Sequence, residues 1–281
     1  MLVSTVPEAI GPFVRLLRGH GHEPVALITR PRVGFGGVED MAVATPPELD
    51  LLVPSSKGRL APLLRAYDPD LLLCLGFPWL IPRDALAVPR LGAVNTHPSP
   101  LPRYRGPNPL GWMFRNDDPE MGLTFHRMDD EFDTGAILAQ GSVPVDDDDH
   151  LQTVAEKLEP LAISLFGRVL ERVASDDRGD PQPEEGASYA GLMEDEWAEI
   201  DWTRTAREVH NQVRSWTLPS ASGIRGALTE LDGERLRVLR TSLHPAVEAE
   251  GSPGMVIGRD DARLLVQCGD RPLWVVETER P

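Results

Sequence analysis

Two short, continuously apolar runs constrain the fold of this chain more than any other feature. Residues 71–77 read LLLCLGF and residues 91–94 read LGAV, with no polar side chain in either run. Strands buried on both faces have this composition, because helices cover both faces of a parallel sheet. Segments with apolar residues at helical spacing, at 7–21 and 58–70, alternate with these and other β-prone stretches. The alternation predicts an α/β domain with a parallel-rich sheet.

The alternation continues beyond these runs and then gives way to a long helix. The sequence predicts a helix over 108–120, followed by strands over 121–129 and 135–145. A helix with an acidic start is expected over 146–177. A polar connector with several Pro and Gly residues comes next, at 180–202.

The last part of the chain has a different pattern. After a helix over 203–216, short alternating segments with turn signals such as LDGE predict a small all-β domain, most simply a barrel. We therefore expect three parts along the chain. They are an α/β domain over 1–179, a linker over 180–203 and a C-terminal β-rich domain over 204–281.

The formal net charge of −16 is concentrated in the middle of the chain. Residues 146–202 carry 4 Lys and Arg against 17 Asp and Glu, whereas residues 203–281 carry 11 against 11. Nucleic-acid-binding proteins usually show the opposite balance, so the charge disfavours such a partner. A neutral domain with 11 Arg can still present one basic face. The tract DDDD at 146–149 is interpreted as a solvated helix cap, and we expect no metal.

Cysteine usage and hydropathy indicate the compartment. Cys74 and Cys268 cannot make a disulfide framework, and Cys74 lies in a run typical of a buried core. The first residues lack the pattern of a signal peptide, and no apolar run approaches the length of a membrane span. We therefore expect a cytoplasmic protein with no membrane partner. The glycine-rich stretch 34–40 lacks the spacing of a dinucleotide-binding turn, so a surface loop is expected there.

The second apolar run leads directly into polar residues. Asn95 and His97 follow LGAV, and prolines at 98, 100 and 102 restrict the backbone just after them. Residues two apart on a strand face the same side, and open α/β sheets bind ligands at the carboxyl ends of their strands. Asp133 follows another β-prone run, in a tight turn before Thr-Gly. An amide, an imidazole and a carboxylate can therefore meet at one edge of the sheet.

These three groups suit acyl transfer to an amine. An Asn N–H can stabilise a developing oxyanion, and a His can do the same or carry a proton. An Asp can hold the His in its charged form and collect the proton that an attacking amine releases. No Ser or Cys lies in a nucleophile elbow, so we expect direct transfer. The alternative is structural: Asn95 caps a turn, His97 is a buried histidine and Asp133 is an ordinary loop residue.

The residues around this site resemble a known family. Asn95-x-His97, Ser99, Pro100-Leu101-Pro102, Gly106 and Asp133-Thr134-Gly135 match, in order and spacing, the signature of the formyltransferases that use 10-formyltetrahydrofolate. The similarity is strongest to the methionyl-tRNA branch of that family. It extends through IDW at 200–202 into the C-terminal part. The resemblance implies a Rossmann-like catalytic domain followed by an OB-like domain.

The resemblance also implies roles for individual residues. Asn95, His97 and Asp133 correspond to the catalytic residues of the family. The stretch GFPWLIP at 76–82 corresponds to the loop that holds the pteridine ring of 10-formyltetrahydrofolate, and the backbone of 129–133 lines the other side. The expected cofactor-binding residues are Phe77, Trp79, Leu80, Ile81, Pro82, Asp129, Asp130 and Glu131.

Departures from the family pattern bear on the acceptor. Pro100 stands where the family usually has Leu, and the basic loop that grips tRNA has no counterpart in a stretch that is acidic after Arg32. The connector 189–197 also lacks the expected Lys. Fewer phosphate contacts mean weaker tRNA binding. We therefore expect a small-molecule amine as acceptor: an amino sugar, an amino acid derivative or a hydroxylamine.

Polar residues after the catalytic strand are candidates for holding this acceptor. They are Ser99, Arg103, Tyr104, Arg105 and Asn108, although both Arg side chains could equally be plain surface charges. Three other functions remain open at this point. They are formyl transfer to methionyl-tRNA, hydrolysis of 10-formyltetrahydrofolate, and a non-catalytic binding role. Homo-oligomer formation is left open by the sequence as well.

Overall fold

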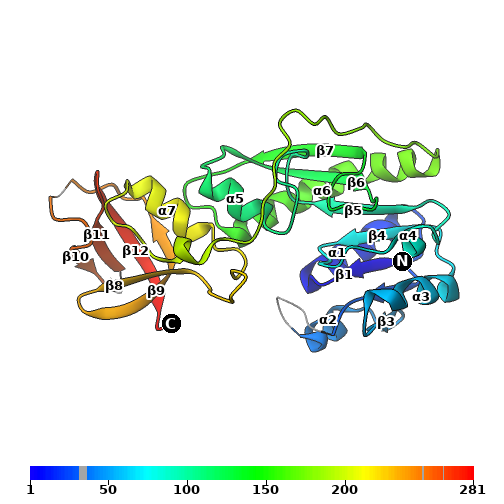
Figure 1. Cartoon of the computed structure of the whole chain (residues 1–281), viewed down its shortest axis with the longest axis horizontal. Coiled ribbons are helices and arrows are strands. Elements are labelled where there is room, and N and C mark those ends of the chain that lie inside the picture. The colour runs from blue at the N-terminus through cyan, green and yellow to red at the C-terminus, as the bar shows by residue number, and fades with distance from the viewer. Residues whose placement is uncertain (32–36, 249, 262) are drawn as a thin grey trace. The chain divides into compact units, whose positions relative to one another are not determined.

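The sheet expected from the apolar runs is present (Figure 1). The computed structural model describes residues 1–31, 37–248, 250–261 and 263–281. In this part of the chain the strand order is β3-β2-β1-β4-β5-β6-β7, with parallel pairing from β3 through β5 and antiparallel pairing of β5 with β6. The strands are β1 (Leu2–Ser4), β2 (Ala26–Ile28), β3 (Asp50–Leu52), β4 (Leu72–Leu75), β5 (Ala93–His97), β6 (Glu120–Arg127) and β7 (Ile137–Pro144).

Helices follow the strands as the α/β pattern requires. The first begins with a proline at its first position, where the missing N–H costs nothing, and it buries Ile10, Val14 and Leu17 on one face. Strand β4 is buried at every position, as its continuous apolar run predicts. The helices are α1 (Pro7–Gly19), α2 (Val38–Ala44), α3 (Leu60–Tyr67), α4 (Arg83–Leu86) and α6 (Leu151–Ala174), with a 3-10 turn at Lys57–Arg59.

Several expectations need correction. Residues 34–36 of the expected loop lie outside the described residues, and the stretch that follows is not a loop, because Val38–Ala44 form α2. The Asp40 carboxylate accepts a hydrogen bond from the Gly37 N–H and so caps this helix. The three-residue strand β3 and the four-residue helix α4 were not expected, because neither is long enough to show a period.

The chain divides into two compact units, each built from three stretches. The first comprises Met1–Arg105, Gly122–Ser142 and Leu158–Ser188, and the second comprises Gly106–Met121, Val143–Lys157 and Tyr189–Pro281. The second contains an antiparallel sheet in the order β10-β11-β12-β9-β8, as expected for a small all-β domain. Its elements are α5 (Pro109–Arg115), a 3-10 turn (Asp195–Ala198), α7 (Ala206–Arg214), β8 (Ala227–Leu231), β9 (Glu234–Ser242), β10 (Val256–Asp260), β11 (Arg263–Gln267) and β12 (Pro272–Glu279).

The acidic tract at 146–149 lies before its helix, and Lys and Arg side chains form ion pairs with its carboxylates. Helix α6 begins only at Leu151, because the Asp149 carboxylate accepts the Asp146 N–H and closes a turn before it. Lys157 Nζ forms an ion pair with Asp146 at 2.7 Å. Arg207 Nη1 lies 2.6 Å from Asp147 Oδ1. These aspartates therefore make hydrogen bonds and ion pairs within the second unit and do not form a freely solvated cap.

Acidification is expected to destabilise the second unit through His210. This buried ring lies between the Asp147 carbonyl oxygen, 2.7 Å from Nε2, and the Thr241 hydroxyl, 2.8 Å from Nδ1. Burial lowers its pKa to about 4. An unfolded histidine has a pKa of about 6.5. Between this pH and 4, the unfolded chain therefore binds a proton at His210 that the folded chain does not bind. The free energy of unfolding is unaffected by protonation of His210 above pH ~6.5. It decreases as the pH falls toward 4, and the loss is about 2 kcal/mol at pH 5.

Urea unfolding of the unaltered protein and of His210→Gln at pH 7.5 and 5.0 measures this effect. The glutamine can still donate to a carbonyl but does not titrate. We expect it to remove about 2 kcal/mol of the loss that the unaltered protein shows at pH 5. An equal loss in both proteins would contradict the assignment to His210.

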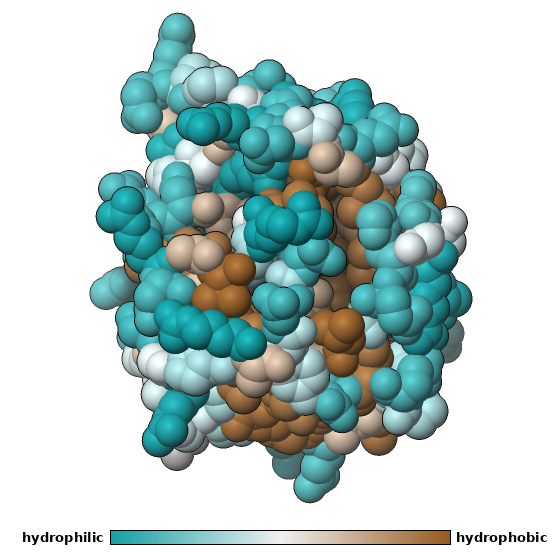
Figure 2. Space-filling view, turned by 90° about the vertical axis from the view of Figure 1, so that its right-hand side faces the viewer, coloured by the Kyte–Doolittle hydropathy of each residue, from teal (hydrophilic) through white to brown (hydrophobic). Residues whose placement is uncertain are grey.

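The surface mixes polar and apolar residues. Figure 2 shows one face, on which brown apolar residues occupy recesses between teal polar ones. Within the described residues, no helix combines the length and the hydropathy that crossing a membrane requires.

Candidate active site

Strand β5 places two of the predicted catalytic side chains on the same side of the sheet. Asn95 and His97 are two residues apart, with Thr96 facing the other way between them. The antiparallel partner β6 sets His126 opposite Asn95 and Thr124 opposite His97. Cross-strand neighbours lie within reach of each other, so β6 contributes its own polar residues to this edge.

The loop after β5 is held by hydrogen bonds on both sides. The Thr124 hydroxyl donates to the Ser99 carbonyl oxygen at 2.7 Å, and the Ser99 hydroxyl donates to the Arg103 carbonyl oxygen at 2.8 Å. Gly122 permits this approach, because a Cβ there would lie 2.3 Å from the backbone nitrogen of Pro100. The loop therefore has little freedom to move His97.

Asp133 lies in a tight turn that positions its carboxylate. Its φ of 59° is in the left-handed region, which costs most residues about 1 kcal/mol and which Asp and Asn tolerate best. The Asp129 carboxylate holds the turn by accepting the Thr134 hydroxyl at 2.7 Å. Gly135 is needed on the other side, because a Cβ there would lie 1.9 Å from the Arg127 carbonyl oxygen.

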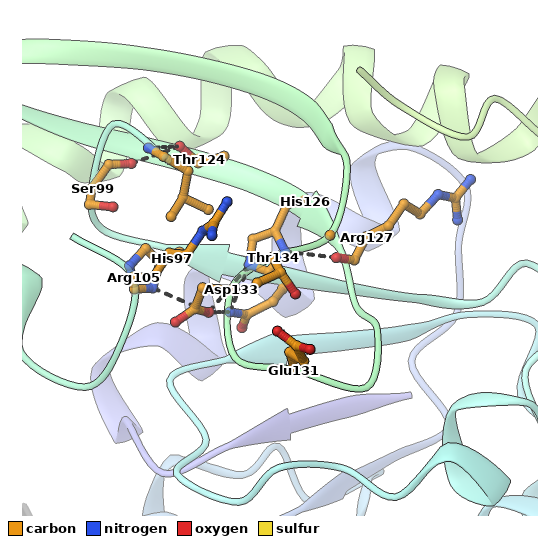
Figure 3. Close-up of polar contacts among 12 residues, drawn as sticks. His97, Ser99, Arg105, Thr124, His126, Arg127, Glu131, Asp133 and Thr134 are labelled. Carbon is orange, nitrogen blue, oxygen red and sulfur yellow. Dashed lines mark hydrogen bonds and ion pairs between the residues drawn. The ribbon is translucent and has the colours of Figure 1, made fainter. Parts of the chain in front are cut away.

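These elements bring three side chains to one carboxylate oxygen. Asp133 Oδ1 lies 3.2 Å from Asn95 Nδ2, 3.5 Å from His97 Nδ1 and 3.5 Å from His126 Nε2. Figure 3 shows both imidazoles converging on Asp133 from adjacent strands. The expected meeting of an amide, an imidazole and a carboxylate is present, and a second imidazole joins them.

Backbone carbonyls assign the tautomer of each ring. His97 Nε2 lies 2.8 Å from the Tyr104 carbonyl oxygen and must donate to it, which leaves the Nδ1 lone pair facing Asp133 when the ring is neutral. His126 Nδ1 lies 2.7 Å from the Arg127 carbonyl oxygen. Its Nε2 is therefore an acceptor for Asn95 Nδ2, at 3.2 Å.

The environment of His97 favours the neutral ring. Burial lowers the pKa of the His97 imidazole, and the Asp133 carboxylate opposes this effect without overcoming it. The expectation that Asp133 holds His97 in its charged form therefore needs correction for the resting site. A neutral His97 has an Nδ1 lone pair ready to accept a proton beside Asp133.

Residues 41–170 match the family described as Formyl transferase, and residues 192–281 match its C-terminal domain. The chain belongs to the formyl transferase family. It is 31% identical to a methionyl-tRNA formyltransferase of Pelobacter propionicus, over 97% of this chain and 86% of that one. A methionyl-tRNA formyltransferase of Citrifermentans bemidjiense is 33% identical over the same shares.

Solved structures share the fold of this formyl transferase. HypX from Aquifex aeolicus in complex with tetrahydrofolic acid matches with a TM-score of 0.74 at 18% identity, over 99% of this chain and 43% of that one. The chain therefore spans less than half of HypX. An N-formyltransferase from Helicobacter canadensis, in complex with folinic acid and dTDP-3-aminofucose, matches with a TM-score of 0.67 at 16% identity, over 99% and 98%.

The residues expected to bind the cofactor lie in two loops of the formyl transferase. Phe77 and Trp79 are partly buried, with ring centroids 5.4 Å apart in an edge-to-face arrangement. Ile81 is buried in the core, while Leu80 and Pro82 are partly buried. In the second loop, Asp129, Asp130 and Glu131 are exposed. Their roles in binding stay predictions.

The residues expected to hold the acceptor differ in their access to solvent. Ser99 is fully buried and bonded within its loop, and Asn108 is 1% exposed and accepts the Thr217 hydroxyl at 2.6 Å. Tyr104 is buried too. Arg103 is exposed, and the Arg105 guanidinium donates to the side chain of Gln182. Contact of these five residues with an acceptor stays a prediction.

Two residues at the site were missed from the sequence. His126 lies in a strand that was expected, but its place beside Asn95 depends on the antiparallel pairing of β5 with β6. Gln182 lies near the start of the expected linker, and nothing in the neighbouring sequence marks it as a site residue. The sequence does contain one signal for His126. In the strand expected over 121–129, Thr124 and His126 are two residues apart and therefore share a face.

Proposed function

We propose that this formyl transferase moves a formyl group from 10-formyltetrahydrofolate directly to a primary amine of a small molecule. The observation that carries the proposal is the convergence of Asn95, His97 and Asp133. One carboxylate oxygen lies 3.2 Å from the amide nitrogen and 3.5 Å from the imidazole nitrogen. This arrangement provides an N–H donor for an oxyanion and two adjacent proton acceptors.

The residues present suit the proposed donor. Phe77 and Trp79 offer aromatic surface for a flat pteridine ring, and the exposed carboxylates of Asp129, Asp130 and Glu131 can accept its N–H groups. Tetrahydrofolic acid is bound in HypX, which has the same fold. When bound, the folate supplies a formyl group on a nitrogen that can leave.

Asn95 has the role of stabilising negative charge. One of its two N–H groups is donated to His126 Nε2, which holds the amide in place. The other is donated to Asp133 Oδ1 at 3.2 Å in the structure, and in the proposed reaction it is donated instead to a formyl oxygen that gains charge during attack. A donor whose amide is already held in place by His126 lowers the barrier, because it has to exchange only its Asp133 partner during the reaction.

His97 and Asp133 handle the proton. The attacking amine must lose one proton, and the departing nitrogen must gain one, so the site has to accept a proton and return it. His97 Nδ1 can take it, since Nε2 remains bonded to the Tyr104 carbonyl oxygen throughout. Asp133 Oδ1, 3.5 Å away, stabilises the imidazolium that forms.

Charge favours a small acceptor over a nucleic acid. Within the described part of residues 203–281, many arginines already have carboxylate partners. Those in ion pairs are Arg207, Arg214, Arg235, Arg237, Arg259, Arg263 and Arg280. Paired cations contribute less to binding phosphates, because the partner must first be displaced. Methionyl-tRNA is the second candidate acceptor, favoured by the names of the relatives at 31% and 33% identity.

An acceptor panel with a salt series tests the proposal. Release of the formyl group from a 10-formylfolate donor would be followed by absorbance with water alone, amino sugars, amino acid derivatives, hydroxylamine and methionyl-tRNA. We expect turnover with a small amine, and kcat/KM should change less than about threefold between 50 and 200 mM salt.

The other outcomes separate the alternatives. A tRNA acceptor held by 6–10 phosphate contacts would lose about 10³-fold or more over that salt range. Turnover with methionyl-tRNA alone would reject the proposal of a small-molecule acceptor. It would not affect the proposed roles of Asn95, His97 and Asp133. Equal rates with water alone would indicate a hydrolase.

A further inference from the structure

The segment Asp180–Ser188 is hydrogen-bonded to β7, which follows the Asp133 turn, and to the loop that follows β5. Its first residue pairs with Ile137 of β7 through two backbone hydrogen bonds of 2.8 Å. At its other end, the Ser188 carbonyl oxygen accepts the Arg105 N–H at 2.9 Å, and the Ser188 hydroxyl accepts the Tyr104 N–H at 2.8 Å. The Tyr104 carbonyl oxygen is the group that assigns the tautomer of His97. The segment therefore crosses from the Asp133 side of the site to the His97 side.

Gln182 makes the central contact of this segment. Its Nε2 donates to the Asp133 carbonyl oxygen at 2.8 Å and to the Gly135 carbonyl oxygen at 2.7 Å. Its Oε1 accepts from Nε and Nη2 of Arg105, at 3.0 and 2.9 Å. Arginine can only donate, so it forces the amide oxygen toward itself and the amide nitrogen toward the two carbonyls.

Gln182 holds the turn at Asp133 from outside the turn. Asp133 has a left-handed backbone, and the Asp129–Thr134 hydrogen bond ties the turn to itself without attaching the Asp133 carbonyl to the rest of the unit. Gln182 provides that attachment on both sides of Thr134. A displacement of about 1 Å at a reacting group can reduce a rate by about 10²-fold.

We infer that Gln182 is a positioning residue for Asp133, with Arg105 fixing the orientation of the Gln182 amide. The inference rests on the proposed function, in which Asp133 acts in proton transfer. In this arrangement the segment 180–188, whose sequence resembles a linker, sets the position of the Asp133 carboxylate. Arg105 acts through Gln182 in this arrangement.

Turnover of Gln182→Ala and Gln182→Glu tests the inference with the acceptor that supports the unaltered enzyme. The glutamate keeps an oxygen for Arg105 but has no N–H for the two carbonyls, so it should behave as poorly as alanine. We expect kcat to fall about 10- to 100-fold in both, with KM for the donor within about threefold. Gln152→Ala, an exposed glutamine bonded only to Glu156 in the hydrogen bonds that the structure shows for it, is the matched control and should be unchanged.

Combination with Asp133→Asn separates positioning from general stability. If Gln182 acts through Asp133, then Gln182→Ala adds no further loss once the carboxylate is gone. Losses that multiply in the double variant, or a kcat within threefold in Gln182→Ala, would overturn the inference. Normal turnover in Asp133→Asn would instead overturn the proposed function.

A spectroscopic readout needs no acceptor. Asp133 Oδ1 lies 3.5 Å from a ring nitrogen of each of His97 and His126, so moving it shifts the NMR signals of both rings. Gln182→Ala should move these signals in the direction seen for Asp133→Asn, and Gln152→Ala should leave them in place. Unmoved signals in Gln182→Ala would overturn the inference even if the variant were less stable.

Discussion

Asp133→Asn is expected to lower kcat by about 10²- to 10⁴-fold, the range for losing a general acid–base group. The amide cannot stabilise the imidazolium that forms when His97 takes a proton, nor can it accept that proton itself. The side chain keeps its shape, and asparagine tolerates the left-handed φ of 59° at this position. The fold should therefore survive, with a melting temperature within a few degrees. Steady-state kinetics and thermal unfolding measure the two effects.

A second aspartate provides the matched control for this change. Asp176 also has a left-handed backbone, with φ of 57°, and lies exposed after helix α6. Asp176→Asn makes the same chemical change in the same backbone conformation without reaching the site. It should keep turnover within about twofold. If Asp133→Asn were as active as Asp176→Asn, the carboxylate would have no part in the chemistry.

Asn95→Ala is expected to reduce kcat by about 10²- to 10³-fold, the measured range for removing one oxyanion donor. The variant loses the N–H that points at Asp133 Oδ1, 3.2 Å away, and leaves His126 Nε2 without its donor. Because the donor acts on charge that develops during attack, KM for the folate should change little. Pre-steady-state measurement of the transfer step would locate the loss in the chemistry.

The neighbouring residue serves as a control for disturbance of strand β5. Thr96 faces the opposite side, and its buried hydroxyl has no hydrogen-bond partner among the described residues. Thr96→Val removes that hydroxyl while keeping the branched shape, so it should leave turnover unchanged and raise the melting temperature slightly. A loss in Thr96→Val as large as that in Asn95→Ala would show that β5 is sensitive to any change and would withdraw the specific role of the amide.

The sequence predicted the sheet, and the edge at which the candidate catalytic residues lie, for physical reasons. The continuous apolar runs at 71–77 and 91–94 identify strands buried on both faces, and β4 and β5 lie within them or extend from them. The polar residues that follow such a strand must lie at its carboxyl end, so Asn95 and His97 could be placed before the fold was known. Short elements such as β3 and α4 could not, because three or four residues carry no period.

The remainder of the site depends on contacts between distant parts of the chain. His126 reaches Asn95 only because β6 pairs with β5 in the antiparallel direction, and an isolated strand pattern does not state its partner. The pKa of His97 is lowered by burial, which the residues adjacent in sequence do not reveal. Gln182 reaches Asp133 across 49 positions of the chain, from a stretch whose composition is that of a connector.

The interleaving of the two units limits how this enzyme can be cut and recombined. The first unit ends at Ser188 and is completed by stretches that begin at Gly122 and Leu158, so no single boundary separates it from the second. A chimera joined at residue 179 would take Asp133 from one parent and Gln182 from the other. A chimera of this chain would therefore have to keep the turn at Asp133 together with the segment 180–188 that is bonded to it.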